Sequence, residues 1–170
     1  TKAPVLILGE VGSGKFAIAR TIHHASALCN GFLSVINCAT VTAEEINQYL
    51  DLAGDGNEPT TIFLRDICHL PVTLSAHVLR LTKSTSIRCL ASTTKNLHEL
   101  CNSGQFCPNL LLSIDAVNIQ VPPLRERPSD IIQLTDAFLA HFSNELNFDI
   151  TISKDSRHLL SQNNWPGNIR

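Results

Sequence analysis

The sequence predicts an α/β fold, in which a doubly wound parallel sheet of five strands is followed by the start of a helical subdomain. Short apolar runs alternate with stretches of helical periodicity up to about Pro128, the pattern of a parallel sheet covered by helices. A glycine-rich turn joins the first apolar run directly to the first helical stretch. Beyond Pro128 the pattern is helical throughout. These three observations favour one sheet-based domain and the beginning of a smaller helical one.

The individual elements follow from the periodicity of the apolar residues and from the turn residues that separate them. Strands are expected at residues 4–8, 32–37, 61–64, 87–92 and 116–121, the last of them ended by Pro122 and Pro123. Helices are expected at residues 16–28, 42–52, 71–81, near 97, at 130–144 and at 156–163. Thr42 and Glu45 have the spacing of a capping box. A turn is expected at residues 54–59, and a loop is expected to run through Gly104 to the fifth strand.

Composition excludes several classes of protein. The 170 residues are 44% hydrophobic, with a net charge of −2 and a pI of about 6.3, so nothing indicates a nucleic-acid surface. No stretch has the length of a membrane span and no signal peptide opens the chain, which predicts a cytoplasmic protein. Because the chain starts at a strand without Met, we expect an excised fragment of a longer protein.

Cysteines and histidines do not have metal-ligand spacing. Cysteine occupies positions 29, 38, 68, 89, 101 and 107 without any CxxC pair, mostly within apolar runs. Disulfides or a metal site are one interpretation, and small buried hydrophobic side chains in a reducing cytosol are the one we favour. The sequence therefore predicts no metal site built from these residues.

The glycine-rich turn has the spacing of a phosphate-binding loop. It consists of Gly9, Glu10, Val11, Gly12, Ser13, Gly14 and Lys15, between a strand and a helix as that motif requires. Glycines let backbone N–H groups surround phosphate oxygens, the helix start adds a positive dipole end, and Lys15 adds a charge. Phe16 departs from the motif, because it replaces the Ser or Thr that coordinates magnesium. The sequence predicts a nucleotide site whose metal ion lacks a ligand.

Several segments together resemble the central AAA+ domain of sigma-54-dependent activators, the bacterial enhancer-binding proteins. Residues 9–15 resemble GESGTGK, residues 19–23 resemble ARAIH, and residues 32–39 resemble FVAVNCAA. Residues 61–70 (TIFLRDICHL) resemble TLFLDEIGEL, and residues 88–97 (RCLASTTKNL) resemble RLIAATNRDL. Residues 121–131 (VPPLRERPSDI) and 165–170 (WPGNIR) nearly repeat the family pattern. The resemblance covers essentially the whole chain.

The resemblance implies an AAA+ nucleotide-binding subdomain at residues 1–127 and a truncated helical lid subdomain at residues 128–170. It also implies a receiver-like domain, as in two-component response regulators, and a DNA-binding helix-turn-helix domain, both outside this chain. Members of the family assemble as dimers and rings, and use ATP hydrolysis to remodel sigma-54 RNA polymerase. Self-association is therefore expected, with DNA contacted only through another domain.

This chain departs from the family wherever hydrolysis and sigma-54 contact are concerned. A GAFTGA loop is expected between Ala39 and Thr61, but nothing there resembles it. The third strand ends in Arg65 and Asp66 instead of the Asp-Glu pair that organises magnesium and water. Arg65 either binds a phosphate in place of the metal's charge or pairs with Asp66, the one weak catalytic candidate. Mg²⁺ binding is accordingly doubtful.

Other family positions are substituted or kept. Thr94 replaces the sensor Asn, and Cys107 and Ser113 replace two arginine fingers, each typically worth roughly 10³–10⁵ in rate. Arg170 keeps the sensor arginine position. Arg125 also keeps its family position, together with Glu126 and Arg127, either at the ligand or in a structural salt-bridge cluster.

Four functions remain open from the sequence. The first is a regulatory domain that binds ATP or ADP, lacks useful hydrolysis, does not contact sigma-54 and works with the housekeeping polymerase. The second, by analogy with VpsR-like biofilm regulators, is a domain that binds cyclic di-GMP through Arg20 and Arg65. The third is a slow ATPase that uses Asp66. The fourth is a scaffold that keeps only the fold.

Overall fold

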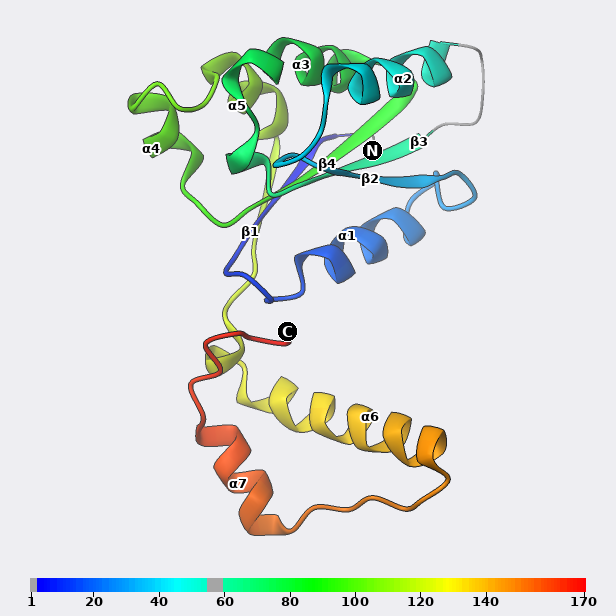
Figure 1. Ribbon diagram of the computed structural model, residues 1–170, viewed down its shortest axis with the longest axis vertical. Helices are drawn as coiled ribbons and strands as arrows, with labels where there is room; N and C mark the ends of the chain where they lie inside the picture. The colour runs from blue at the N-terminus through cyan, green and yellow to red at the C-terminus, as the bar shows by residue number, and fades with distance from the viewer. Residues whose placement is uncertain (1–2, 55–59) are drawn as a thin grey trace. The chain divides into compact units, whose positions relative to one another are not determined.

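The structure is a computed structural model that describes residues 3–54 and 60–170 (Figure 1). It divides into two compact units, Thr1–Gly9 with Gly14–Val121 and Glu10–Ser13 with Pro122–Arg170. The sheet and most of the helices belong to the first unit. The turn expected at residues 54–59 lies outside the described residues apart from Gly54, the last residue of a helix.

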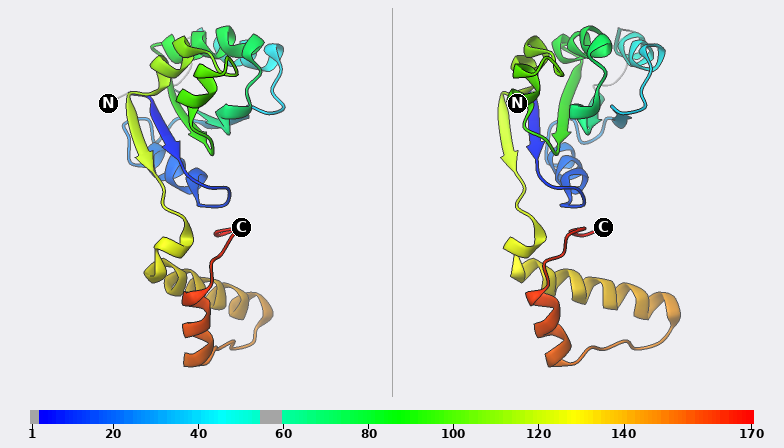
Figure 2. Two further views of the ribbon diagram at one scale, coloured as in Figure 1. Left: turned by 90° about the vertical axis from the view of Figure 1, so that its left-hand side faces the viewer. Right: turned by 60° about the vertical axis from the view of Figure 1, so that its left-hand side comes forward.

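The first unit contains the expected sheet of five parallel strands. They are β1 (Val5–Leu8), β2 (Leu33–Asn37), β3 (Thr60–Arg65), β4 (Ile87–Thr93) and β5 (Val117–Gln120). The strand order is β2-β3-β4-β1-β5, and every neighbouring pair is parallel. In both views of Figure 2 the yellow-green β5 lies beside the blue β1 at one edge of the sheet. The predicted α/β sheet is confirmed.

Helices cover the two faces of this sheet, so it is doubly wound. They are α1 (Lys15–His24), α2 (Ala43–Gly54), α3 (Ser75–Lys83), α4 (Leu97–Asn102) and α5 (Pro108–Ile114), with 3-10 turns at Ile67–His69 and Val72–Leu74. Along β3, Phe63 belongs to the core cluster that includes Ala19 of α1, whereas Ile62 and Leu64 belong to the cluster on the opposite face. This alternation gives a strand buried on both sides its continuous apolar sequence.

Three helix predictions need correction. The helix expected at residues 16–28 ends at His24, because the Ser26 hydroxyl donates to the His23 carbonyl oxygen (2.7 Å) and accepts from the Leu28 amide (3.2 Å). Such side-chain hydrogen bonds compete with the helical pattern. The helix expected at residues 71–81 begins only at Ser75, after a 3-10 turn.

The third correction is α5, which lies where the sequence pattern predicts a loop. Pro108 starts it, at a position where the missing N–H group costs no hydrogen bond. Leu110, Leu111 and Ile114 of α5 are buried in the core cluster. The helix is short, so these three apolar residues give too little periodicity to reveal it. The capping box of α2 was predicted correctly, since Thr42 and Glu45 exchange hydrogen bonds of 2.9 and 3.2 Å.

The second unit contains the helical region that the sequence predicted. It consists of a 3-10 turn (Leu124–Glu126), α6 (Pro128–Leu146) and α7 (Lys154–Gln162), with α6 packed against α7. Arg157 of α7 forms an ion pair with Asp136 of α6, and the Trp165 indole donates to the Leu160 carbonyl oxygen (2.8 Å). No helix among the described residues is long and apolar enough to cross a membrane.

The cysteines do not all share one environment. Cys38, Cys68 and Cys89 are buried, Cys101 and Cys107 are partly buried, and Cys29 is exposed, so the expectation of burial does not hold for Cys29. Burial raises the pKa of the Cys38 and Cys89 thiols to about 12. The described residues contain no group of three or more side chains that could hold a metal ion.

Candidate functional site

The phosphate loop is divided between the two units. Gly9 and Gly14–Phe16 belong to the first unit, and Glu10–Ser13 belong to the second. Gly9 donates its backbone N–H to the Thr93 carbonyl oxygen at the end of β4 (3.2 Å). Gly12 (φ 77°) and Gly14 (φ 96°) adopt left-handed backbone conformations, which glycine tolerates best. The two glycines therefore allow the turn between β1 and α1.

Lys15, in the first turn of α1, reaches back to the start of the loop. Its Nζ donates to the Gly9 carbonyl oxygen at 2.8 Å. Partial burial lowers the pKa of Lys15, and the negative charge of Asp66 partly opposes this shift. The hydrogen bond to Gly9 places the ammonium group at the carboxyl end of β1. A phosphate there would meet a cation that is already partly removed from water.

Phe16, at the position of the magnesium-binding hydroxyl, packs against the sheet. The centroid of its ring lies 5.6 Å from that of Phe63, with the planes tilted by 37°. Phe63 is fully buried, whereas Phe16 remains 44% exposed. The side chain thus contributes an aromatic contact at the start of α1 and offers no oxygen to a cation.

Arg65 and Asp66 end β3 as a loose pair. Arg65 Nε lies 3.7 Å from Asp66 Oδ2, which is an ion pair without the geometry of a hydrogen bond. The Arg65 side chain is 58% exposed. Asp66 has a left-handed backbone (φ 53°), and its amide donates to the Ser92 hydroxyl at 3.0 Å. The pairing with Asp66 leaves most of the Arg65 side chain exposed, and the interpretation in which Arg65 binds a phosphate stays a prediction.

Thr94, which follows β4, has a sulfur neighbour. Its hydroxyl lies 3.7 Å from the Cys68 thiol, and that thiol lies 3.7 Å from Nδ1 of His69. Sequence reasoning did not connect Cys68 or His69 with the site, although both lie within residues 61–70, a segment that resembles the family. Arg20, the other candidate for a cyclic dinucleotide, lies on the exposed surface of α1.

Cys107 and Ser113, at the two positions expected for arginine fingers, lie at and within the helix α5. Cys107 immediately precedes α5. The Ser113 hydroxyl donates to the Leu110 carbonyl oxygen (2.7 Å) and accepts from the Thr82 hydroxyl of α3 (3.1 Å). Ser113 therefore ties α5 to α3 within the first unit.

In the second unit, Arg125 holds Glu10. Its two terminal nitrogens donate to the two carboxylate oxygens at 2.9 and 2.6 Å, the bidentate arrangement of strong charge-assisted pairs. The hydrogen bonds from Arg125 and Asn168 lower the pKa of Glu10 to about 2. Glu10 thus stays ionised down to strongly acidic pH.

Asn168 makes three side-chain hydrogen bonds in this unit. It is 2% exposed, and its Oδ1 accepts from the Leu124 amide at 2.7 Å. Its Nδ2 donates to the Glu10 carboxylate (3.1 Å) and to the Val11 carbonyl oxygen (2.9 Å). Sequence reasoning named only Arg170 in this segment and missed Asn168. The signal was present, because Asn168 lies inside WPGNIR.

The carbonyl oxygens of Gly12 and Ser13 also accept hydrogen bonds within this unit. Ile169 donates its amide to the Gly12 carbonyl oxygen at 3.0 Å, and Arg127 Nη2 donates to the Ser13 carbonyl oxygen at 3.0 Å. A Cβ placed on Gly12 would lie 2.2 Å from the Gly167 carbonyl oxygen and 3.1 Å from Cβ of Arg170. The predicted sensor arginine therefore lies beside Gly12.

These residues fit a nucleotide phosphate better than they fit a magnesium ion. The Ser13 hydroxyl is buried without a hydrogen-bond partner among the described residues, and such atoms usually have one. Lys15 supplies the positive charge. For the cation, Phe16 offers only carbon, and the guanidinium of Arg65 accompanies the Asp66 carboxylate. The continuous loop at residues 9–15 would hold the phosphates, which supply the negative charge that this loop binds.

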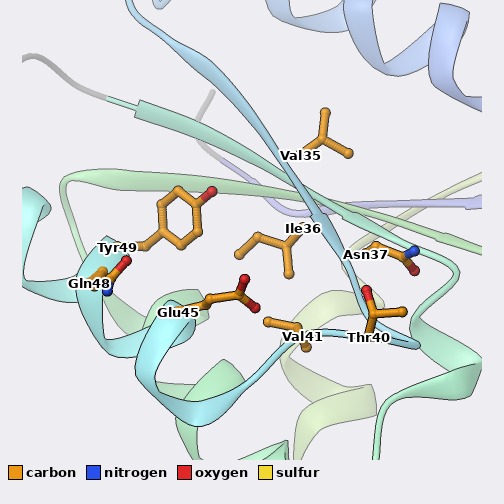
Figure 3. Close-up of a pocket in the computed structure, with 8 residues that line it drawn as sticks. All are labelled: Val35, Ile36, Asn37, Thr40, Val41, Glu45, Gln48 and Tyr49. Carbon is orange, nitrogen blue, oxygen red and sulfur yellow. The ribbon is translucent and has the colours of Figure 1, made fainter.

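A separate hollow of about 430 Å³ lies beside β2 (Figure 3). Val35, Ile36 and Asn37 of β2, Thr40 and Val41 of the following turn, and Glu45, Gln48 and Tyr49 of α2 line it. None of the predicted site residues is among them. The hollow therefore does not belong to the phosphate loop.

Comparison with known proteins identifies the family. A model described as the sigma-54 interaction domain matches residues 1–124, and one described as the AAA+ ATPase lid domain matches residues 125–170. The chain belongs to the sigma-54 interaction domain family. It is 34% identical to the alginate biosynthesis transcriptional regulatory protein AlgB of Pseudomonas syringae, and the match includes every residue of this chain. It is 32% identical to the nitrogen fixation protein VnfA of Azotobacter vinelandii, again over its whole length.

The chain spans less than half the length of these regulators, 44% of AlgB and 38% of VnfA. Among solved structures it is similar to NtrX from Brucella abortus in complex with ADP (TM-score 0.84, 25% identity) and with ATP (0.81, 26%). Each match covers 99% of this chain, and 43% and 45% of the two NtrX chains. The AAA+ P-loop fold and the sigma-54 activator family are thereby confirmed.

Proposed function

We propose that this chain is the central regulatory domain of a bacterial transcriptional regulator, and that it binds ATP or ADP but does not hydrolyse ATP at a useful rate. We place its nucleotide-binding subdomain at residues 1–127 and its lid at residues 128–170. A receiver-like domain and a helix-turn-helix domain would lie elsewhere in the protein, and self-association would follow the family. NtrX, whose fold is so similar, was crystallised with each of these two nucleotides.

One observation carries the binding part of the proposal. The loop offers Lys15, the buried Ser13 hydroxyl and two left-handed glycines in the order that phosphate binding requires. None of these features depends on a metal ion. Nucleotide binding is therefore easier for this chain to keep than catalysis.

The loss of hydrolysis rests on the end of β3 and on Phe16. Asp66 is one methylene group shorter than the usual glutamate, so its reach to a water molecule is poor, and its carboxylate lies 3.7 Å from Nε of Arg65. Phe16 removes a magnesium ligand, and Cys107 and Ser113 supply no charge to a neighbouring subunit. Each loss alone slows phosphoryl transfer, and together they leave no complete catalytic set.

The absence of sigma-54 contact rests on the short segment between β2 and β3. The described part of that segment is the turn at residues 38–42 and the helix α2. The match to AlgB extends over 199 residues against 170 here, so the relative carries additional residues inside the matched region. A domain without this element would work with a polymerase that carries another sigma factor.

Titration calorimetry with ATP, ADP and cyclic di-GMP tests the binding claim, with Lys15→Ala as the control. We expect saturable heats with ATP and ADP that disappear in Lys15→Ala. Heats with cyclic di-GMP alone would overturn the choice of ligand, and no heat with any of the three would leave the chain as a scaffold.

A further inference from the structure

Within the second unit, each of residues 10–13 of the phosphate loop accepts a hydrogen bond from a segment near the lid helices. Arg125 and Asn168 hold the Glu10 carboxylate, and Asn168 also holds the Val11 carbonyl oxygen. The Ile169 amide and the Arg127 guanidinium hold the carbonyl oxygens of the next two residues. Four consecutive residues thus have an acceptor bound by a donor from segments 124–127 or 167–170. We call Glu10, Arg125 and Asn168 the loop clamp.

Holding the acceptors fixes where the amides point. Successive N–H and C=O groups of a loop point in different directions. When the oxygens are bound by the lid segments, the N–H groups of the same residues therefore point away from those segments. Among the described residues, the amides of Val11 and Gly12 donate to no backbone carbonyl. These are the groups that a phosphate-binding loop presents to its ligand.

Asn168 makes the clamp a buried element of this unit and not a surface salt bridge alone. Exposed ion pairs usually contribute little, and the side chains of Arg125 and Glu10 are 40% and 43% exposed. Asn168, however, is almost fully buried and uses both ends of its amide. The backbone of Asn168 is left-handed (φ 54°). It lies in a turn in which the backbone N–H of Asn168 donates to the Trp165 carbonyl oxygen at 2.8 Å.

We propose that the loop clamp is a set of positioning residues for nucleotide binding, through which residues 10–13 are ordered together with the lid segments 124–127 and 167–170. The inference deepens the function proposed above and rests on it for its ligand. Ordering of the lid segments and ordering of the phosphate loop are then one event. By linkage, a nucleotide that orders the loop also orders these lid segments.

The first test needs no nucleotide. Arg125→Gln removes the bidentate pair, and Arg157→Gln is its matched control, because Arg157 pairs with Asp136 in the same unit away from the loop. Hydrogen–deuterium exchange is measured on the peptides that cover residues 10–14, 165–170 and β4. We expect faster exchange in the first two peptides for Arg125→Gln only, with β4 unchanged. Unchanged exchange of residues 10–14 in Arg125→Gln would overturn the proposal.

The second test uses ADP as the probe. We expect Arg125→Gln to bind ADP roughly tenfold more weakly, the scale of one lost charge-assisted hydrogen bond, and Arg157→Gln to stay within about twofold. Arg125→Lys, which keeps the charge without the fork, should fall in between. Faster loop exchange with unchanged ADP affinity would overturn the positioning role. If the unmodified protein binds no ADP, the proposed function fails, and the exchange test still decides whether the clamp orders the loop.

Discussion

Gly12 and Gly167 approach each other so closely that a methyl group on Gly12 would lie 2.2 Å from the Gly167 carbonyl oxygen. This distance is far shorter than any contact that a real Cβ makes. The backbone of Gly167 leaves no room for a side chain at this point of the phosphate loop. Gly12 is therefore needed for packing within the second unit as well as for its left-handed backbone.

Substitution of Gly12 separates these two reasons. Gly12→Ala adds both a left-handed alanine, which costs about 1–2 kcal/mol, and the clash with Gly167. Gly104→Ala is the matched control, since Gly104 has a similar φ (71°) and a Cβ added there would meet nothing within 4 Å. Thermal unfolding should show a larger loss of stability for Gly12→Ala. Equal losses in both variants would mean that the close approach has no energetic effect.

Substitution of Phe16 tests the account of the missing metal ligand. Phe16→Thr restores a hydroxyl and removes the ring that packs on Phe63, so we expect a loss of about 1–2 kcal/mol for this half-exposed aromatic side chain. We also expect ADP affinity to become more dependent on Mg²⁺ in the variant than in the unmodified protein. Phe16→Leu, which loses the ring without gaining an oxygen, is the control. Equal Mg²⁺ dependence in all three proteins would contradict this account of Phe16.

Acid should weaken the loop clamp only at low pH. The pKa of Glu10 is about 2 in the folded protein, below its ordinary value of 4.5, so its contribution to stability is complete above pH 4.5. That contribution is lost as the pH falls from 4.5 towards 2. The difference in unfolding free energy between the unmodified protein and Glu10→Gln should therefore be constant above pH 4.5 and shrink below it. A difference that shrinks already between pH 7 and pH 5 would contradict the assignment.

Thiol reactivity should follow burial. Cys29 is exposed, whereas burial raises the pKa of Cys38 and Cys89 to about 12, so almost none of either is thiolate at pH 8. Timed alkylation of the native protein followed by mass spectrometry should label Cys29 first and Cys38 and Cys89 only after unfolding. Early labelling of Cys89, a residue of the central strand β4, would show that the sheet opens in the native state.

Much of the fold follows from local pattern. The five strands were predicted within one or two residues, since strands buried on both faces are continuous apolar runs between turn residues. The C-terminal part of the first helix and the whole of α5 were not predicted correctly. In the first case the Ser26 side chain ends the helix, and in the second three core contacts define a helix of only seven residues.

The site was predictable where it is contiguous in the sequence. Residues 9–15 form one motif, so spacing alone indicates their chemistry. Asn168 contacts Glu10, which is 158 positions away in the sequence, and no local sequence pattern predicts that these two residues meet. The pairing of Arg65 with Asp66 was one of two alternatives, because sequence cannot decide whether an arginine side chain binds its neighbour or a ligand.

The central claim is that this domain binds ATP and does not turn it over. Phosphate release is measured over several hours with ATP and Mg²⁺ at concentrations that saturate binding, in the unmodified protein and in Lys15→Ala. We expect the unmodified protein to bind ATP, Lys15→Ala not to bind it, and phosphate release to be the same in both. Steady phosphate release that disappears in Lys15→Ala would contradict this claim and make Asp66 a working catalytic residue.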